Sequence, residues 1–404
     1  MSAVARAELA SIYDSRGRPT VEAEVVLASG SRGRAGAPSG ASTGAHEVRA
    51  FPDGGVPAAI RAFRERVVPR LVGADAADQA GVDARLRSAD GTADFSGIGG
   101  NAATAASVAT ARAFAAEQGR PLWSVLARPG VDGRQFPAIV GNCLNGGRHA
   151  IGGPDIQEFL AFADAPRPDD SIAAALRVHQ LVGEALHRRF PQHALGRGDE
   201  GGWVAPIENV AAIELLADAC ERARDELHVE VHPGLDLAAS EFCTDDRYRY
   251  REQTLDTEGQ VGFVVGLVDR YGLRYVEDPL DEEAFDAFAE LTRAVGSRTL
   301  VIGDDIYTTR ADRLAIGLAR SSSNAVLIKV NQVGTLTDTF ACVDLARRSG
   351  WSTIASHRSG EVPDDWLAHV ALATGARGLK CGLLGGERVA KLNELLRLGR
   401  ATGA

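Results

Sequence analysis

Hydrophobic and polar residues alternate in short runs over residues 5–35, and glycine or proline interrupts the runs. A period of two broken by such residues is typical of antiparallel strands joined by tight turns. Over residues 56–126 the apolar positions recur instead about every 3.6 residues, most clearly in the alanine-rich stretch 101–118, which predicts helices. The chain is therefore expected to begin with a small α+β domain over residues 1–130.

After Pro137 short apolar runs alternate with helical patterns, which predicts a larger second domain over residues 137–404. The predicted strands are Ala138–Leu144, Ile156–Phe162, Gly234–Ala238, Arg274–Glu277, Leu300–Gly303, Ala325–Val330, Ser352–Ser356 and Gly378–Cys381. Helices are expected between most of them, for example at Phe263–Tyr271, Ala284–Val295, Leu336–Arg348 and Trp366–Thr374. Regular alternation of strand and helix favours an α/β fold with a parallel β/α barrel.

A charged or ionisable residue closes or follows six consecutive predicted strands. These residues are Asp236, Glu277, Asp304, Lys329, His357 and Lys380. In a β/α barrel the carboxyl ends of the strands meet on one face, where catalytic residues gather. A single polar residue at a strand end can simply meet solvent, but six in succession indicate a functional site.

Three of these residues are carboxylates, which would repel one another strongly if they shared a buried space. A divalent cation relieves that repulsion, and an all-oxygen ligand set suits Mg²⁺ or Mn²⁺ better than zinc. Neutralisation by arginines is the alternative. The sequence thus predicts a metal site at Asp236, Glu277 and Asp304.

The basic residues are unevenly divided, because the chain contains 41 arginines and only three lysines. Arginine cannot act as a base, whereas a lysine beside a cation and a second ammonium can lose its proton near neutral pH. Two of the three lysines, Lys329 and Lys380, follow predicted barrel strands. We interpret both as functional, at positions that need either deprotonation or a compact ammonium group, and we expect the third, Lys391, to be a charge on a helix surface.

The formal net charge is −10, and no cluster of basic residues resembles a nucleic-acid-binding stripe. No run of 18 apolar residues predicts a membrane span, and the first residues lack a secretory signal pattern. The five cysteines are scattered and show no CxxC spacing, so neither a disulfide framework nor a zinc site is indicated. A cytoplasmic protein without nucleic-acid or membrane partners is expected.

Three loops carry further candidate chemistry. Residues 198–202, GDEGG, form either a plain turn or a glycine-flanked loop whose carboxyl, once buried, would have a pKa raised into the range of a proton donor. Residues 356–360, SHRSG, combine hydroxyls, an imidazole and a guanidinium, which suits a phosphate. Residues 38–44, PSGASTG, form a small-residue loop that is either a surface linker or a segment that closes over an anion and a metal.

Together these motifs resemble the enolase (phosphopyruvate hydratase) family along nearly the whole chain. Further matching motifs are DSRG at 14–17, PTVE at 19–22, NGG at 145–147 with His149, IQEF at 156–159, LD at 235–236, ASEF at 239–242, VEDPL at 276–280, GDD at 303–305, LIKVNQ at 327–332 with GT at 334–335, and SHRSGE at 356–361. The resemblance implies an α+β N-terminal cap and a βββααα(βα)₆ barrel, usually assembled as a homodimer or a higher homo-oligomer.

The resemblance also implies residue roles in eliminating water from 2-phosphoglycerate or a close analogue to give an enol phosphate. Lys329 would take the C2 proton, Glu200 would assist loss of the C3 hydroxyl, Glu158 would support Glu200, and His149 would close over the site. Two Mg²⁺ ions are implied, the first held by Asp236, Glu277 and Asp304 and the second, arriving with substrate, held in part by Ser39. Lys380 would bind the substrate carboxylate, and His357, Arg358 and Ser359 would line the phosphate position.

Two departures from the family pattern leave more than one substrate open. Arg148 precedes the lid histidine, and the segment after Lys380 lacks one residue and an arginine relative to the family pattern. A more anionic substrate is one hypothesis, as in paralogues that form carboxyphosphonoenolpyruvate during phosphonate antibiotic biosynthesis; an ordinary glycolytic role is the other. A non-catalytic scaffold is a third, although such a protein would be expected to have lost a carboxylate or lysine of the site.

Overall fold

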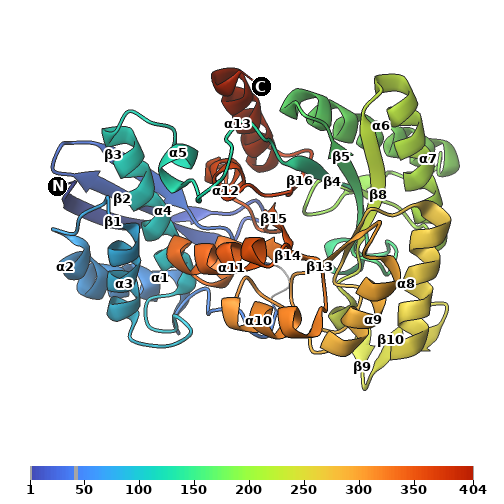
Figure 1. Cartoon of the computed structure of the whole chain (residues 1–404), viewed down its shortest axis with the longest axis horizontal. Helices are drawn as coiled ribbons and strands as arrows, with labels where there is room; N and C mark the ends of the chain where they lie inside the picture. The colour runs from blue at the N-terminus through green and yellow to red at the C-terminus, as the bar shows by residue number, and fades with distance from the viewer. Residues whose placement is uncertain (1, 41–43, 404) are drawn as a thin grey trace.

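The computed structural model describes residues 2–40 and 44–403, and these form a small N-terminal domain beside a closed barrel (Figure 1). The candidate loop 38–44 is therefore only partly described, because residues 41–43 lie outside these ranges. Within the described ranges, no helix is both long enough and apolar enough to cross a membrane.

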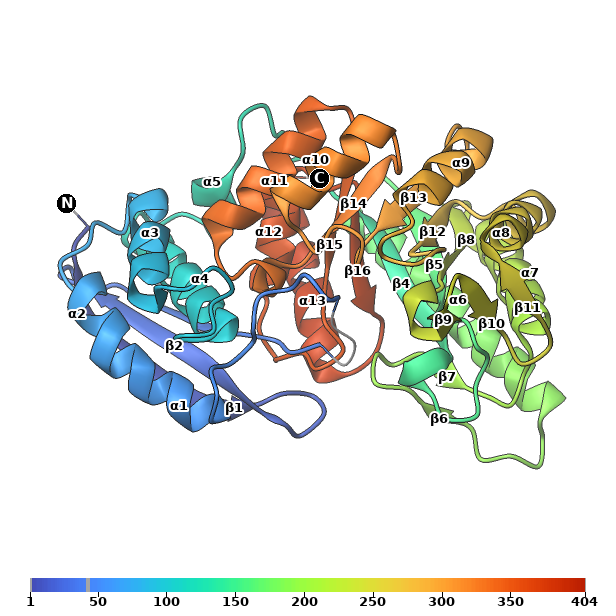
Figure 2. The same ribbon diagram turned by 90° about the horizontal axis from the view of Figure 1, so that it is seen from below.

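The N-terminal domain is a three-stranded antiparallel sheet covered by helices, as the change of period predicts. Its elements are β1 (Val4–Tyr13), β2 (Pro19–Leu27), β3 (Arg32–Gly36), α1 (Gly55–Ala62), the π-helical turn η1 (Phe63–Val67), α2 (Val68–Leu71), α3 (Gln79–Asp90), α4 (Gly100–Glu117) and α5 (Leu122–Leu126). Helix α4 is almost wholly buried because it lies between this sheet and the barrel (Figure 2). Its many alanines allow that close approach, and Gly33 of β3 has no room for a Cβ beside Ala109.

Eight strands close the barrel, because β16 pairs with β4. The strands are β4 (Ala138–Asn145), β5 (Glu158–Asp164), β8 (Glu230–Asp236), β12 (Tyr275–Glu277), β13 (Leu300–Gly303), β14 (Ala325–Ile328), β15 (Ser352–Ser356) and β16 (Gly378–Gly382). The helices around them are α6 (Pro168–Arg189), α7 (Asn209–Leu227), α8 (Thr257–Tyr271), α9 (Phe285–Val295), α10 (Ala311–Arg320), α11 (Leu336–Arg348), α12 (Trp366–Thr374) and α13 (Gly386–Thr402). Each predicted strand and each of the four predicted helices is present, with ends shifted by a few residues.

The barrel differs from the all-parallel expectation at β5, which runs antiparallel to both neighbours, β4 and β8. Because its direction is reversed, its first residue rather than its last lies at the active end of the barrel. Glu158 consequently pairs in register with Asp236 on β8 and with Asn145 on β4.

The expected βββααα opening is also corrected, because only two barrel strands and two long helices, α6 and α7, precede β8. The additional strands there, β6 (Gly196–Arg197) and β7 (Trp203–Val204), form a small hairpin that touches β4 at one position. A further small sheet lies after β8 and consists of β9 (Cys243–Thr244), β10 (Arg247–Arg249) and β11 (Thr254–Asp256).

The two domains are joined at the barrel mouth. Ser39 and Gly360 exchange backbone hydrogen bonds of 2.7 and 2.8 Å, so the candidate loop at 38–40 is fastened to the SHRSG loop. A Cβ at Gly360 would meet both the Asp14 carboxylate and the Ser39 carbonyl, so this contact needs glycine. Trp366 of α12 also donates its indole N–H to the Gly36 carbonyl.

Lys391 of α13 is buried, which corrects the expectation of a helix-surface charge. Its Nζ donates hydrogen bonds to the carbonyl oxygens of Val362, Asp364 and Glu387 at 3.0, 2.6 and 2.9 Å, and it lies 3.4 Å from Glu361 Oε1. The 3.6-residue pattern could not predict this, because most of the partners belong to a loop that folds over the helix. Lys391 and Lys380 are therefore both buried, and Lys329 is half-buried.

Replacing Lys391 with Met should destabilise the protein by about 2–4 kcal/mol, because buried carbonyls and the Glu361 carboxylate lose their partner. Chemical denaturation compares this variant with Arg397→Met, which removes an exposed side chain from the same helix. Equal stability of the two variants would contradict a structural role for Lys391.

Candidate functional site

The predicted site residues meet at the mouth of the barrel, around a narrow cavity of about 20 Å³, the space of roughly one water molecule. Most of them line it, with Glu158 and His149 from β5 and the loop before it, Glu200 from the GDEGG loop, Asp236 and Asp304 from strand ends, and Lys329, His357, Arg358, Ser359 and Lys380. Because the space is so small, the charged groups contact one another directly.

Lys380 at β16 is the centre of one group of contacts. Its Nζ lies 2.8 Å from Asp236 Oδ2, 2.8 Å from both carboxylate oxygens of Glu277 and 3.1 Å from Glu158 Oε2. Burial lowers the pKa of Lys380, but these three carboxylates outweigh it, and the pKa lies well above its ordinary value. The lysine is therefore a fixed positive charge.

Glu277 lies behind the cavity and is fully buried. Tyr275 donates its hydroxyl hydrogen to Glu277 Oε2 at 2.5 Å. Burial and the neighbouring Asp236 charge raise the pKa of Glu277 well above its ordinary value. A cation at this position would therefore also stabilise the ionised form of Glu277.

Lys329, the candidate base at the end of β14, forms a partly buried ion pair with Asp304. Burial lowers the pKa of Lys329, but the Asp304 charge outweighs it and raises the pKa. In return Lys329 outweighs burial and lowers the pKa of Asp304. The expectation of a lysine that deprotonates near neutral pH is therefore not met while Asp304 is its partner.

Residues outside the predicted set hold Asp304 in place. The Asp278 carboxylate accepts the backbone N–H groups of Asp304 and Asp305 at 2.9 Å each, and Gln332 donates its amide to Asp304 Oδ1 at 2.9 Å. Asp278 and Gln332 fall in motifs that match the family, but spacing alone gives no signal for their positioning role.

The carboxylates provide oxygen ligands of the kind that Mg²⁺ prefers. Among the described residues, ligand atoms of Asp278, Asp304 and Asp305 lie within 4.8 Å of one another, and so do those of His149, Glu158 and Glu200. The predicted trio does not form such a cluster, because the Lys380 ammonium lies against Asp236 and Glu277 while Lys329 pairs with Asp304. The carboxylate oxygens of the site fit a hard divalent cation. The ammonium groups of Lys380 and Lys329 contact the predicted ligands directly.

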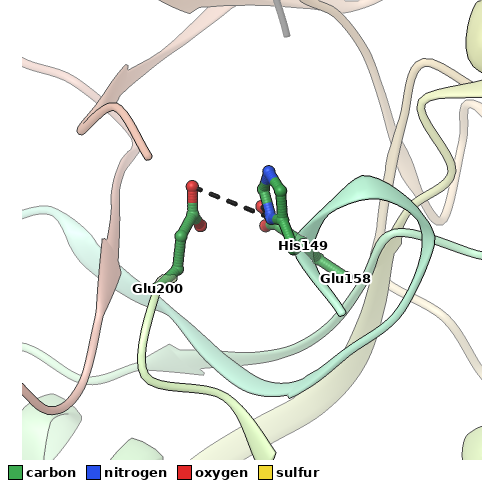
Figure 3. A group of neighbouring side chains, drawn as sticks. All are labelled: His149, Glu158 and Glu200. Carbon is green, nitrogen blue, oxygen red and sulfur yellow. Dashed lines mark ion pairs between the residues drawn. The ribbon is translucent and has the colours of Figure 1, made fainter. Parts of the chain in front are cut away.

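Figure 3 shows His149, Glu158 and Glu200 converging on one point. His149 Nδ1 lies 3.2 Å from Glu158 Oε1 and 4.0 Å from Glu200 Oε1. Burial lowers the pKa of His149, but the two carboxylates outweigh it and raise the pKa to about 9. The imidazole is therefore cationic at neutral pH.

The two glutamates of this cluster have opposite pKa shifts. Burial and the Glu200 charge raise the pKa of Glu158 to about 7. Burial also raises that of Glu200, but the His357 and His149 imidazoles outweigh it, and the pKa lies well below its ordinary value. The expected raised pKa of Glu200 is thus corrected, and Glu158 is the carboxyl that holds a proton near neutrality.

The SHRSG loop is buried at the other side of the cavity. Arg358 forms a bidentate pair with Glu47, with distances of 2.9 and 3.1 Å, and also donates to Asn331 Oδ1 at 3.2 Å. Sequence reasoning missed Glu47. It lies close to the residues outside the described ranges and would have to release Arg358 before the guanidinium could hold an anion.

Besides Glu277, which lies behind the cavity, the predicted residues that do not line it are Ser39 and Arg148. The Ser39 hydroxyl accepts a hydrogen bond from Asn101 at 3.1 Å, while the adjacent Gly40 lines the cavity. Ser42 and Thr43, the other hydroxyls of this loop, lie outside the described residues. Arg148 pairs with Glu241 at 2.5 Å on the outer side of the lid.

In metal-free protein, His149 should titrate with a pKa of about 9. Its folded-state pKa exceeds the ordinary value of 6.5, so its stabilising contribution is complete below pH 6.5 and is lost as the pH rises through 9. Glu200→Gln should lower the pKa of His149, because it removes the largest charge that raises it.

Histidine NMR measures the titration, and urea unfolding measures the stability at each pH. Wild type should lose more stability over this pH range than His149→Gln does. A pKa of His149 at or below its ordinary value would contradict the proposed charge cluster.

Both parts of the chain match known protein families. Residues 4–126 match the family model described as "Enolase, N-terminal domain", and residues 134–404 match "Enolase, C-terminal TIM barrel domain".

Similar proteins named enolase extend over the whole length. That of Halorubrum lacusprofundi is 47% identical over 401 residues, covering 98% of this chain and 99% of the relative. That of Methanothermobacter thermautotrophicus is 46% identical, covering 96% and 94%. That of Natronomonas pharaonis is 46% identical, covering 98% and 99%. The chain therefore belongs to the enolase family.

Proposed function

We propose that this protein is a hydro-lyase that eliminates water from 2-phosphoglycerate to give phosphoenolpyruvate. The observation that carries the proposal is that an enolase-family chain, matched along nearly its whole length, keeps Asp236, Asp304, two lysines and the Glu158–Glu200 pair around one cavity, with Glu277 directly behind it. A non-catalytic scaffold protein would not be expected to keep so many charged groups together in a confined space.

Asp236, Glu277 and Asp304 are proposed to hold the first Mg²⁺, and a second is expected with substrate. When bound, the cation supplies positive charge beside the substrate carboxylate, where negative charge builds up as the C2 proton leaves. The Ser39 hydroxyl accepts a hydrogen bond from Asn101, and Ser39 is not among the residues that line the cavity, so its role as a ligand stays a prediction.

Lys329 is proposed to take the C2 proton. To do so it must leave its ion pair with Asp304, because that pair favours the protonated amine. Recruitment of Asp304 as a metal ligand would weaken the pair. The fixed charge of Lys380 and the guanidinium of Arg358 suit the substrate carboxylate and phosphate, respectively.

Loss of the C3 hydroxyl needs a proton, which we assign to the Glu158–Glu200 pair. Glu158 holds that proton near neutral pH and Glu200 lines the same cavity, with His149 within reach of both. Glu200 is thus proposed to deliver a proton that Glu158 stores.

The structure does not support the hypothesis of a more anionic substrate. Arg148 pairs with Glu241 outside the catalytic cavity, and in the segment after Lys380 the buried Arg388 contacts His357 of the site. The division into residues 1–130 and 137–404, the cytoplasmic location and the homodimer or higher homo-oligomer stay predictions.

In the direct test, purified protein is mixed with Mg²⁺ and 2-phosphoglycerate, and the absorbance of the enol product, phosphoenolpyruvate, is recorded. Turnover in the common range of about 1–10³ s⁻¹ is expected, and chelation should abolish it. Negligible turnover of 2-phosphoglycerate with efficient turnover of a carboxyphosphono analogue would overturn the proposal.

Two substitutions separate the proton steps. Lys329→Ala should reduce both C2 hydrogen exchange in deuterated water and dehydration, each by about 10²–10⁴-fold. Glu200→Gln should reduce dehydration while exchange continues. Arg377→Gln, an exposed barrel position, is the control. Exchange that survives in Lys329→Ala would show that another group is the base.

A further inference from the structure

Arg388 is a fully buried arginine in the first turn of α13, and the reaction described above leaves it without a role. Its guanidinium lies between the two loops that carry Glu200 and the Arg358–Ser359 pair. Nη2 donates to the carbonyl oxygens of Asp199 at 3.1 Å and Ser359 at 2.7 Å, and Nη1 donates to the Arg358 carbonyl oxygen.

Arg388 also donates from Nη1 to Nδ1 of His357 at 2.7 Å. The backbone N–H of Gly382 points to the same nitrogen at 3.2 Å. A guanidinium has only donors and stays charged, so the imidazole nitrogen that it contacts must offer a lone pair. Two donors therefore exclude a proton from Nδ1.

The position of the His357 proton follows from these contacts. With Nδ1 as acceptor, the neutral imidazole carries its proton on Nε2, which lies 3.0 Å from Glu200 Oε2. An N–H group there favours the ionised carboxylate of Glu200, which it faces at ion-pair distance. In the other tautomer, the lone pair of His357 Nε2 would face a lone pair of Glu200 Oε2, and the two would repel each other.

We propose that Arg388 is a positioning residue that keeps His357 neutral, with its proton on Nε2, and thereby orients Glu200 for proton delivery. The hydrogen bonds to the carbonyls of Asp199, Arg358 and Ser359 hold the two loops at the separation that this contact needs. The catalytic consequence rests on the proposed function, whereas the tautomer itself does not.

Nitrogen-15 NMR of histidine-labelled protein reads the tautomer directly, and His357→Gln assigns the signal. In wild type, His357 should stay neutral with its proton on Nε2 from about pH 5 to about pH 9. A proton on Nδ1, or an imidazolium within that range, would overturn the proposal.

Arg388→Met should let His357 exchange tautomers or titrate and should lower kcat by roughly 10- to 100-fold, the effect expected when the partner that orients an active-site group is lost. Arg388→Lys should restore the tautomer in part, because one ammonium can still donate to Nδ1. A wild-type tautomer in a folded Arg388→Met variant would overturn the proposal. If that variant does not fold, Arg388→Lys and the wild-type spectrum still decide the point.

Lys391→Met is the matched control, because it releases the same loop without removing the contact to His357. It should lower stability but leave the His357 tautomer unchanged, and a tautomer change there would overturn the assignment to Arg388. If wild type showed the expected tautomer but no turnover of 2-phosphoglycerate, the proposed function and the role of Arg388 in proton delivery would fail, while the assignment of the tautomer to Arg388 would stand.

Discussion

The central constraint on this structure is that several carboxylates share a buried barrel mouth with almost no room for water. Burial disfavours each charge, and every neighbouring carboxylate increases the cost. The fold meets this with fixed partners, since Lys380 contacts three carboxylates, Lys329 contacts Asp304, and Arg358 contacts Glu47. The lysines and Arg358 are thus already paired with carboxylates of the protein. A substrate anion and a metal cation that enter the site must therefore replace partners in these pairs.

That exchange explains why the pKa values here differ from those expected of a working catalyst. Asp304 stabilises the protonated form of Lys329, and the two imidazoles stabilise the ionised form of Glu200. While these contacts hold, Lys329 is not in the form that accepts a proton and Glu200 is not in the form that donates one. Glu158 is instead the carboxyl that is protonated near neutral pH. Occupancy, rather than the protein alone, would have to bring the base and the acid to their working states.

Much of the architecture could be predicted from sequence, because barrel strands are short apolar runs and their charged ends recur at the spacing of a strand and a helix. Asp236, Asp304, Lys329 and Lys380 are accordingly together. The reversal of β5 could not be predicted in this way, since an apolar run has no direction. Nor could the burial of Lys391 or the contacts of Glu47 and Arg388, because each depends on a loop from elsewhere in the chain.

The reversed strand also decides what kind of cover this site can have. In a parallel pair the connection from β4 to the next strand would return along the outside of the barrel as a helix. Here the chain turns back at the mouth itself, so the segment with Arg148 and His149 is a hairpin whose two ends are Asn145 and Glu158. A cover that is fixed at both ends to strands of the site can pivot but cannot move away from it, and any movement at its second end would displace Glu158 as well.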